Sequence, residues 1–229
     1  MSAPDVGVVI VAAGKGERAG GSELKQFRWV AGKPMLLHSV QLFHARNDVA
    51  MVVCVLPRDK AGDPPPWLFQ SDLDRLLVSV GGRERGDSVA NGLEDLPSDI
   101  SIIVIHDAAR PLATADTVER VIAAARKGVG AVAAIPVIDT IKRVADDRVA
   151  ETVDRRNLWR AQTPQAFPRE MIEKAHAEAR ARNLHATDDA ALCEMLGYPV
   201  EIVLGSERAM KITDEDDFAR AEALSILPG

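Results

Sequence analysis

Short apolar runs rich in valine and isoleucine recur along this chain, and they constrain its fold more than any other feature. Within most of these runs the apolar residues are continuous, whereas a strand with one solvated face alternates apolar and polar residues. Continuous runs of strand length indicate strands buried on both faces, which is typical of a mostly parallel sheet flanked by helices. The runs predicted as strands are Val6–Val11, Val49–Leu56, Leu76–Val80, Ile100–Ile105, Ala131–Ile135 and Val200–Leu204.

Segments with helical periodicity separate these runs. Pro34 suits the first turn of a helix, and Met35, Leu36, Val40 and Phe43 after it share one helix face. Further helices are predicted at Ser88–Leu96, Thr114–Lys127, Arg169–Arg182, Asp188–Leu196 and from about Asp214. The alternation predicts an α/β fold, and because the sequence contains neither a linker nor an internal repeat, we expect one domain over residues 1–229.

The strand–helix rhythm breaks after Pro136. Thr140–Ala145 and Val149–Val153 flank the polar tripeptide 146–148, which predicts a hairpin. The segment has too few apolar residues for a core of its own, and an isolated two-stranded hairpin is marginally stable in water. We therefore expect a protruding arm at about 138–155 that packs on another part of the assembly.

Charge and composition narrow the range of partners. The chain has 229 residues and a net charge of −6, so it lacks the broad basic character that a nucleic-acid polymer requires. No apolar stretch approaches the roughly 18 residues of a membrane helix, and the N-terminus lacks the basic region of a signal peptide. Cys54 and Cys193 lie in apolar patterns typical of reduced core thiols. We expect a soluble cytoplasmic protein with no membrane partner.

The first apolar run leads directly into a glycine-rich loop. Gly14 and Gly16 allow backbone N–H groups to approach phosphate oxygens closely, and Arg18 and Lys25 add positive charge on the same loop. A glycine-rich turn after a strand is common in α/β proteins for steric reasons alone. The two cations shift the interpretation toward a phosphate-binding site.

Other polar clusters follow predicted strands, at the sheet edge where α/β proteins bind ligands. The segment 81–88 carries glycines and ends at Ser88, which could cap the next helix or bond a base. The segment 106–111 places Asp107 where a carboxylate could meet a metal or sugar hydroxyls, or pair with Arg110 as a structural ion pair. We expect His106 to orient that loop or to pack. The segment 209–213 carries Lys211.

The sequence lacks the motifs of several common types of active site. No His/Cys cluster has the spacing of zinc ligands, and no Gly-x-Ser-x-Gly elbow is present. The loop after the first run does not close with Lys-Ser/Thr, so it is not a standard P-loop.

Eight polar motifs occur in order along the chain. They are Ala12-Ala13-Gly14-x-Gly16-x-Arg18 with Lys25-Gln26, Gly81-Gly82-x-x-Arg85-x-Asp87-Ser88, His106-Asp107-Ala108-Ala109-Arg110-Pro111, Asp139-Thr140-Ile141-Lys142, Thr152-Val153-Asp154-Arg155, Thr163-Pro164-Gln165, Thr187-Asp188-Asp189 and Lys211-Ile212-Thr213. This ordered set resembles the 2-C-methyl-D-erythritol 4-phosphate cytidylyltransferase family over nearly the whole chain. Arg83 stands where that family commonly has an acidic residue.

The resemblance implies a three-layer, Rossmann-like nucleotidyltransferase sandwich of the glycosyltransferase-A type, with a mixed, mostly parallel sheet. It implies a homodimer with embracing arms, and transfer of CMP from CTP to methylerythritol phosphate with Mg²⁺ or another divalent cation. The implied catalytic residues are Arg18, Lys25, Arg155 and Lys211. The implied CTP-binding residues are Ala12, Ala13, Gly14, Gly16, Lys25, Gly82, Arg85, Ser88, Asp107, Ala108 and Lys211. The implied acceptor-binding residues are Asp107, Arg110, Thr140, Arg155, Thr163 and Thr187, with Asp107 also next to a metal held mainly by the CTP phosphates.

Other functions compete with this interpretation. A related enzyme could transfer CMP to ribitol 5-phosphate or another polyol phosphate through the same nucleotide loop. A dinucleotide-dependent oxidoreductase would use Gly14-x-Gly16 as a Rossmann fingerprint, but Lys25 in the loop and the lack of a clear third glycine argue against it. A non-catalytic nucleotide sensor would not require Arg18, Lys25, Arg155 and Lys211 together.

Overall fold

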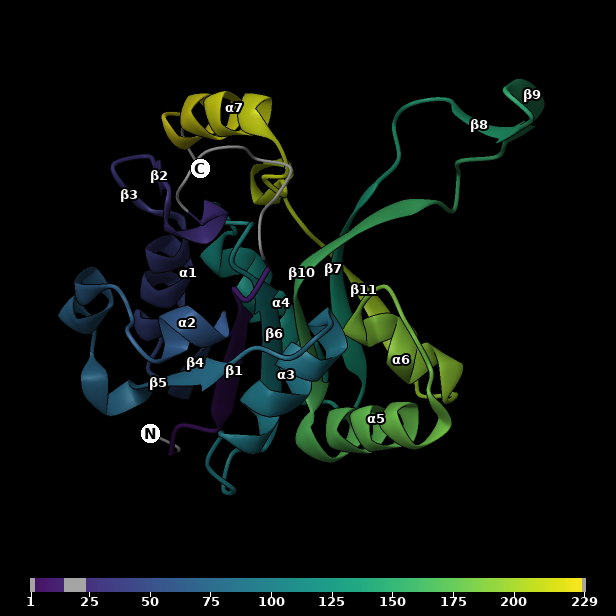
Figure 1. The fold of residues 1–229 in the computed structure, drawn as a ribbon. Helices are drawn as coiled ribbons and strands as arrows, with labels where there is room; N and C mark the ends of the chain where they lie inside the picture. The colour runs from purple at the N-terminus through teal and green to yellow at the C-terminus, as the bar shows by residue number, and fades with distance from the viewer. Residues whose placement is uncertain (1–2, 15–23, 228–229) are drawn as a thin grey trace.

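A central sheet with helices on both faces organises the chain, as a computed structural model of residues 3–14 and 24–227 shows (Figure 1). The strand order is β11-β7-β10-β6-β1-β4-β5, and every strand except β10 runs in the same direction. The predicted mostly parallel mixed sheet is therefore confirmed. Its strands are β1 (Val6–Val11), β4 (Val49–Leu56), β5 (Leu76–Val80), β6 (Ile102–Asp107), β7 (Gly130–Pro136), β10 (Trp159–Pro168) and β11 (Val200–Leu204).

Two apolar clusters, one on each face of the sheet, form the core. Because adjacent strand residues point to opposite faces, Val8 and Ile10 of β1 belong to one cluster and Val9 belongs to the other. Helices α1 (Met35–His44) and α4 (Ala115–Ala125) cover the first face. Helices α3 (Arg85–Glu94), α5 (Arg169–Arg182) and α6 (Asp189–Met195) cover the second, which completes the three predicted layers.

The strand β10 is the one central element that the sequence analysis missed. It lies between β6 and β7, antiparallel to both. Its sequence contains two prolines and several polar residues, which argue against a central strand. The buried polar side chains are satisfied inside the sheet, since Gln162 bonds the backbone of Ser206 and Gln165 bonds Asp188.

The predicted arm projects away from the sheet (Figure 1). Its strands β8 (Ile141–Ala145) and β9 (Arg148–Val153) pair antiparallel across a two-residue turn. Both turn residues, Asp146 and Asp147, have positive φ, the backbone conformation of a tight hairpin turn, which aspartate tolerates. The chain leaves the sheet at the end of β7 and returns at the start of β10, so both attachments lie at one edge of the sheet.

Smaller elements surround the sheet. The pair β2 (Trp29–Val30) and β3 (Lys33–Pro34) packs with α7 (Glu215–Ser225) in a third apolar cluster that includes Met35 and Ile212. None of the helices in the described part of the chain could cross a membrane. The remaining short elements are η2 (Lys25–Phe27), α2 (Arg58–Ala61), η3 (Pro66–Gln70), η4 (Leu73–Arg75) and η5 (Glu207–Ala209).

Candidate active site

One cavity of about 530 Å³, here called the main cavity, opens at the carboxyl ends of β1, β5 and β6. Among the described residues, all those predicted to bind CTP line it; Gly16 and Arg18 lie outside the described residues. Its lining comprises Val11, Ala12, Ala13, Gly14, Lys25, Gln26, Met35, Gly82, Arg83, Glu84, Arg85, Ser88, Asp107, Ala108, Ala109 and Lys211.

The turn after β5 can only be built from glycine. A Cβ on Gly81 would lie 2.3 Å from the Ala13 Cβ, and one on Gly82 would lie 2.2 Å from the Asp87 Cβ. The Ser88 hydroxyl closes this turn, because it accepts the Gly82 N–H at 3.1 Å and donates to the Glu84 carbonyl at 3.0 Å. Glu84, not Ser88, is the N-cap of α3, so the alternative that Ser88 caps the helix is wrong.

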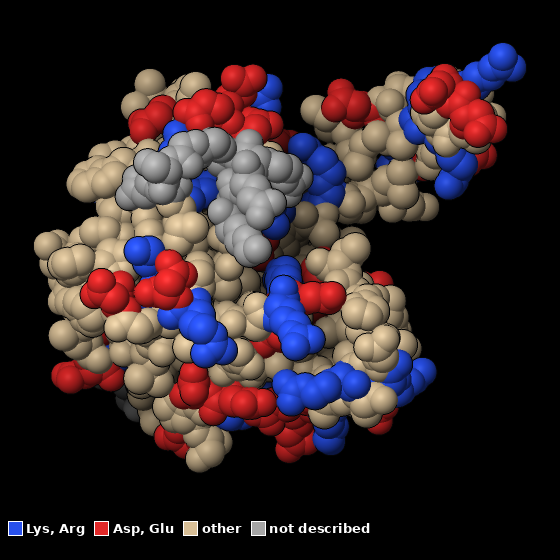
Figure 2. All heavy atoms as spheres, in the orientation of Figure 1, with Lys and Arg blue, Asp and Glu red and all other residues tan. Residues whose placement is uncertain are grey.

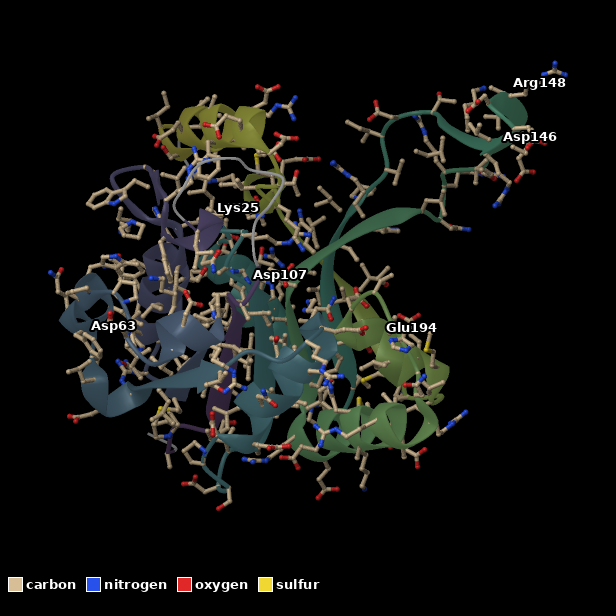
Figure 3. The ribbon with its side chains drawn as sticks, viewed as in Figure 1. Lys25, Asp63, Asp107, Asp146, Arg148 and Glu194 are labelled. Carbon is tan, nitrogen blue, oxygen red and sulfur yellow. The ribbon has the colours of Figure 1, made fainter. Side chains whose placement is uncertain are left out.

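The loop after β1 returns to the cavity at Lys25. The Lys25 Nζ donates to the Ile212 carbonyl at 2.7 Å, and the Gln26 side chain donates to the Ala12 carbonyl at 2.7 Å. Figure 3 shows Lys25 and Asp107 at the same end of the sheet. The two motifs on either side of the cavity, the first loop and the segment 209–213, are thus bonded to each other.

Asp107 carries the densest charge contacts in the main cavity. Its Oδ2 accepts from Lys211 Nζ at 2.7 Å and its Oδ1 accepts from Arg85 Nε at 3.2 Å. Burial alone would raise the pKa of Asp107, but the neighbouring Arg85 and Lys211 hold that pKa well below its usual value. The carboxylate is therefore ionised. Arg110 instead donates to the carbonyl of Ala209, so the predicted alternative of an Asp107–Arg110 ion pair is wrong.

Beneath Asp107 lies a buried chain of polar groups. The Thr163 hydroxyl accepts the Asp107 N–H at 2.9 Å and lies 3.1 Å from His106 Nδ1, and His106 Nε2 faces the Arg110 carbonyl at 3.3 Å. Burial lowers the pKa of His106 to about 4, so the ring is neutral at pH 7. With Thr163 donating to Nδ1 and Nε2–H donating to Arg110, every group is satisfied. His106 orients the loop, as predicted.

The sequence model of the 2-C-methyl-D-erythritol 4-phosphate cytidylyltransferase family matches residues 6–226. The chain belongs to this family. It is 41% identical over 228 residues to the cytidylyltransferase of Syntrophus aciditrophicus, covering 96% of this chain and 95% of that protein. It is 39% identical to the bifunctional enzyme IspD/IspF of Desulfotalea psychrophila, with 94% of this chain covered, and spans 55% of that protein's length.

The same family appears among solved structures. The cytidylyltransferase of Thermus thermophilus superposes with a TM-score of 0.80 at 35% identity, covering 96% of this chain and 98% of that one. The resemblance drawn from the ordered motifs is confirmed, and so is the nucleotidyltransferase fold.

The residues that the cytidylyltransferase resemblance assigns to the acceptor are not gathered in one place. Thr163 lies under Asp107, and Arg110 lies next to it, bonded to Ala209 and Ala161. Thr187 is exposed just before α6. Thr140 and Arg155 are both on the arm, whose far end carries Asp146 and Arg148 and lies well away from Asp107 (Figure 3).

The arm does not fold back on its own subunit. Arg155 donates to the Ile138 carbonyl within the arm, and Asp154 pairs with Arg156. The Asp154 carboxylate is therefore paired with Arg156 and not with Arg155.

Two buried residues at the cytidylyltransferase site had no role assigned from sequence. Asp189 accepts from Arg85 Nη1 at 2.7 Å, and His176 on α5 bonds the other oxygen of Asp189 at 3.0 Å. Asp189 belongs to a motif that the sequence analysis singled out, but nothing in sequence spacing joins residue 189 to residue 85. His176 carries no sequence signal beyond its place on the buried face of a helix.

Proposed function

We propose that this chain transfers CMP from CTP to 2-C-methyl-D-erythritol 4-phosphate, with residues 1–229 as one cytidylyltransferase domain. The observation that carries the proposal is the main cavity, where glycine backbone and the cations Lys25, Arg85 and Lys211 converge at the carboxyl edge of the sheet. A triphosphate needs that combination of close backbone approach and local positive charge. Membership of the family supplies the identity of both substrates.

The reaction requires positioning and charge stabilisation. A phosphate oxygen of the acceptor attacks the α-phosphorus of CTP; the new P–O bond forms as the bond to the β-phosphate's bridging oxygen breaks, and pyrophosphate leaves. Arg18, Lys25 and Lys211 stabilise the negative charge that develops on the transferring phosphate and the leaving group. Since the acceptor phosphate is already an anion, no side-chain nucleophile is needed, which agrees with the absence of a nucleophile–base motif in the sequence.

The Ser88 hydroxyl discriminates cytosine from uracil. Its proton is committed to the Glu84 carbonyl and one lone pair to the Gly82 N–H, so only a lone pair is left to face the main cavity. An acceptor at this position pairs with the amino group of cytosine and repels the carbonyl oxygen of uracil. Backbone groups near Ala13 and Gly82 complete the recognition of the base.

The donor set of the main cavity fits a divalent ion only in part. Within residues 3–14 and 24–227, no group of three or more His, Cys, Asp or Glu side chains could hold a metal. Asp107 is the single carboxylate next to Lys211, which fits Mg²⁺ held mainly by the substrate phosphates with one protein oxygen. When bound, such an ion offsets phosphate charge. Asp107 supplies the fixed oxygen, because Arg85 and Lys211 hold its orientation.

The acceptor end of the site requires a second copy of the chain. Thr140 and Arg155 lie on an arm that extends from its own body, and exposed apolar residues on that arm favour burial against a partner. In a homodimer with embracing arms, Arg155 of one chain would bind the acceptor phosphate next to the main cavity of the other.

The two cysteines are buried and free, as expected of a protein acting in the reducing cytoplasm.

Phosphorus NMR of the purified protein with CTP, Mg²⁺ and methylerythritol phosphate tests the proposal. The expected result is release of pyrophosphate together with a new diphosphodiester signal. Ribitol 5-phosphate in a parallel reaction distinguishes the related polyol-phosphate activity, which would give the diphosphodiester only with that acceptor. Tight CTP binding with no turnover on either acceptor would instead identify a nucleotide sensor.

A further inference from the structure

Arg85 lies between two buried carboxylates on opposite sides. Its Nε donates to Asp107 at 3.2 Å, and its Nη1 donates to Asp189 at 2.7 Å. Lys211 and His176 occupy the outer ends of this row, so positive and donor groups alternate with carboxylates along five side chains. Asp107 and Lys211 line the main cavity, whereas Asp189 and His176 line a second cavity of about 170 Å³, and Arg85 lines both.

Asp189 and His176, at one end of this row, are held in place by burial and by their neighbours. The Asp189 side chain is 1% exposed and the His176 side chain is 8% exposed, so both are largely shielded from bulk solvent where they bond each other. Burial alone would raise the pKa of Asp189, but Arg85 and His176 together hold that pKa below its usual value, and Asp189 stays ionised. The start of α6 is fixed to β10, because Gln165 accepts the Ala190 N–H and donates to Asp188.

An arginine shared between two carboxylates stays at the position where both bonds can form. If Asp189 lost its charge, Arg85 would be attracted to Asp107 alone, and nothing would oppose its movement toward the main cavity. The Asp107 carboxylate would then be pulled from the orientation that Lys211 sets. Displacements of about 1 Å in a catalytic site can cost up to about 100-fold in rate.

We propose that Asp189 and His176 are positioning residues: His176 fixes Asp189, and Asp189 holds the Arg85 guanidinium where it orients the Asp107 carboxylate for CTP and its metal. Neither residue touches the substrate. This inference rests on the proposed function, because its kinetic test needs the enzyme to turn over CTP. Measuring CTP affinity gives a second test that does not need turnover.

The first test replaces Asp189 with asparagine, which keeps the shape and removes the charge. In Asp189→Asn, kcat/KM for CTP is expected to fall about 10- to 100-fold. The loss divides between weaker CTP binding, measured by calorimetry, and slower turnover. The matched control is Ile172→Val, a buried substitution on the same helix as His176 that leaves Asp189 untouched. It should lower the thermal midpoint and leave both kinetic constants unchanged.

A second pair of variants keeps the proposal falsifiable if Asp189→Asn does not fold. His176→Leu removes the group that bonds Asp189 and should lower kcat/KM for CTP several-fold. His176→Gln retains an N–H donor at nearly the same position and should keep most of the wild-type kcat/KM. A folded Asp189→Asn with wild-type kinetics and CTP affinity overturns the proposal, as do equal kinetics of the leucine and glutamine variants. If the wild type binds CTP but makes no product, the proposed function fails, and CTP affinity alone still tests the positioning role.

Discussion

The main cavity and the arm both carry basic side chains expected at the reacting phosphates, but they differ in what holds those side chains in place. In the main cavity, Lys211 and Arg85 bond one buried carboxylate. On the arm, Arg155 is exposed and donates to the Ile138 carbonyl of the same arm, and the neighbouring Lys142 and Arg143 bond side chains of the facing strand. Figure 2 shows charges of both signs exposed at the arm's end, and Val144 and Val149 are 58% and 62% exposed.

The difference indicates which part of the site one chain can complete. In the main cavity, Lys211 and Arg85 are held in place before any ligand arrives, because both bond the buried Asp107 carboxylate. The arm has no core of its own, and two strands alone are marginally stable in water. In the proposed homodimer, the arm is therefore expected to gain stability by packing on the partner chain. Each of the following predictions tests a property of the cavity or a property of the arm.

The largest effect is expected at the cavity. Lys25→Ala should reduce kcat by about 10² to 10³, since a lost donor to a developing anion costs about 2.7–4 kcal/mol. CTP binding measured by calorimetry should fall much less. Lys33→Ala is the control, because Lys33 bonds Gln41 outside the main cavity. Near-normal turnover by Lys25→Ala would remove this residue from the catalytic assignment.

The second prediction tests whether the arm completes a neighbour's site. Arg155→Ala and Lys25→Ala chains should each be inactive alone, but after subunit exchange about a quarter of all sites would carry neither defect. Partial recovery of activity in the mixture is expected. Arg156→Ala serves as the control for a general effect on the arm, because Arg156 pairs with Asp154 within the arm. If subunit exchange is verified and activity does not return, Arg155 acts in its own chain's site.

The third prediction concerns the buried base of the cavity. The folded pKa of His106, about 4, is below its unfolded value of 6.5, so the unfolded state takes up the proton first. The free energy of unfolding therefore falls as the pH decreases from 6.5 to 4. Below pH 4, His106 causes no further loss. At about 1.4 kcal/mol per pKa unit, the loss is about 3 kcal/mol.

Urea unfolding at pH 7 and pH 4 measures that loss. In His106→Gln the difference between the two pH values should be smaller by up to about 3 kcal/mol. His38 and His44 also have pKa values lowered by burial, but they are common to both proteins and cancel in the comparison. An unchanged difference would mean that folding does not lower the pKa of His106.

A smaller effect is expected from the base-reading hydroxyl. Ser88→Ala should narrow the preference for CTP over UTP by about tenfold, the equivalent of about 1.4 kcal/mol, since a single hydrogen bond is lost. The ratio of kcat/KM values for the two nucleotides measures it. Equal use of CTP and UTP by the wild type would contradict this account of base recognition. Arm variants should leave the ratio unchanged.

The smallest effect is expected from a substitution on the exposed face of the arm. Val149→Ser in the arm should change the free energy of unfolding of the monomer by less than about 0.5 kcal/mol, whereas Ile105→Ala in β6 should cost about 2–5 kcal/mol. In sedimentation experiments at decreasing concentration, Val149→Ser should dissociate before the wild type. Identical dissociation of the two proteins would show that this face of the arm is not buried between chains.

The parts of the fold that could be predicted are those that depend on the local sequence pattern. Strands β1 and β4 match their predicted bounds, because a continuous apolar run becomes a strand when it is buried on both faces. The edge strands β5 and β11 also match their predicted bounds, but they are partly exposed, so the expectation of burial on both faces is wrong for them. The strand β10 was missed because its polar residues are compensated by distant groups, such as Ser206 for Gln162. The same holds at the site: glycines and cations after strands were found from spacing, whereas the bond from Arg85 to Asp189 spans 104 positions and only the folded chain reveals it.

The reversed direction of β10 has a consequence for how this family can change over time. Because β7 ends and β10 begins at the same edge of the sheet, residues 137–158 form an excursion that starts and finishes next to each other. Evolution can lengthen, shorten or replace such an excursion without shifting any strand's register, since the paired residues on both sides stay where they are. If the arm binds the acceptor as proposed, the body serves as a shared CMP-donating unit, and exchange of the arm gives descendants of one ancestor a route to different acceptors.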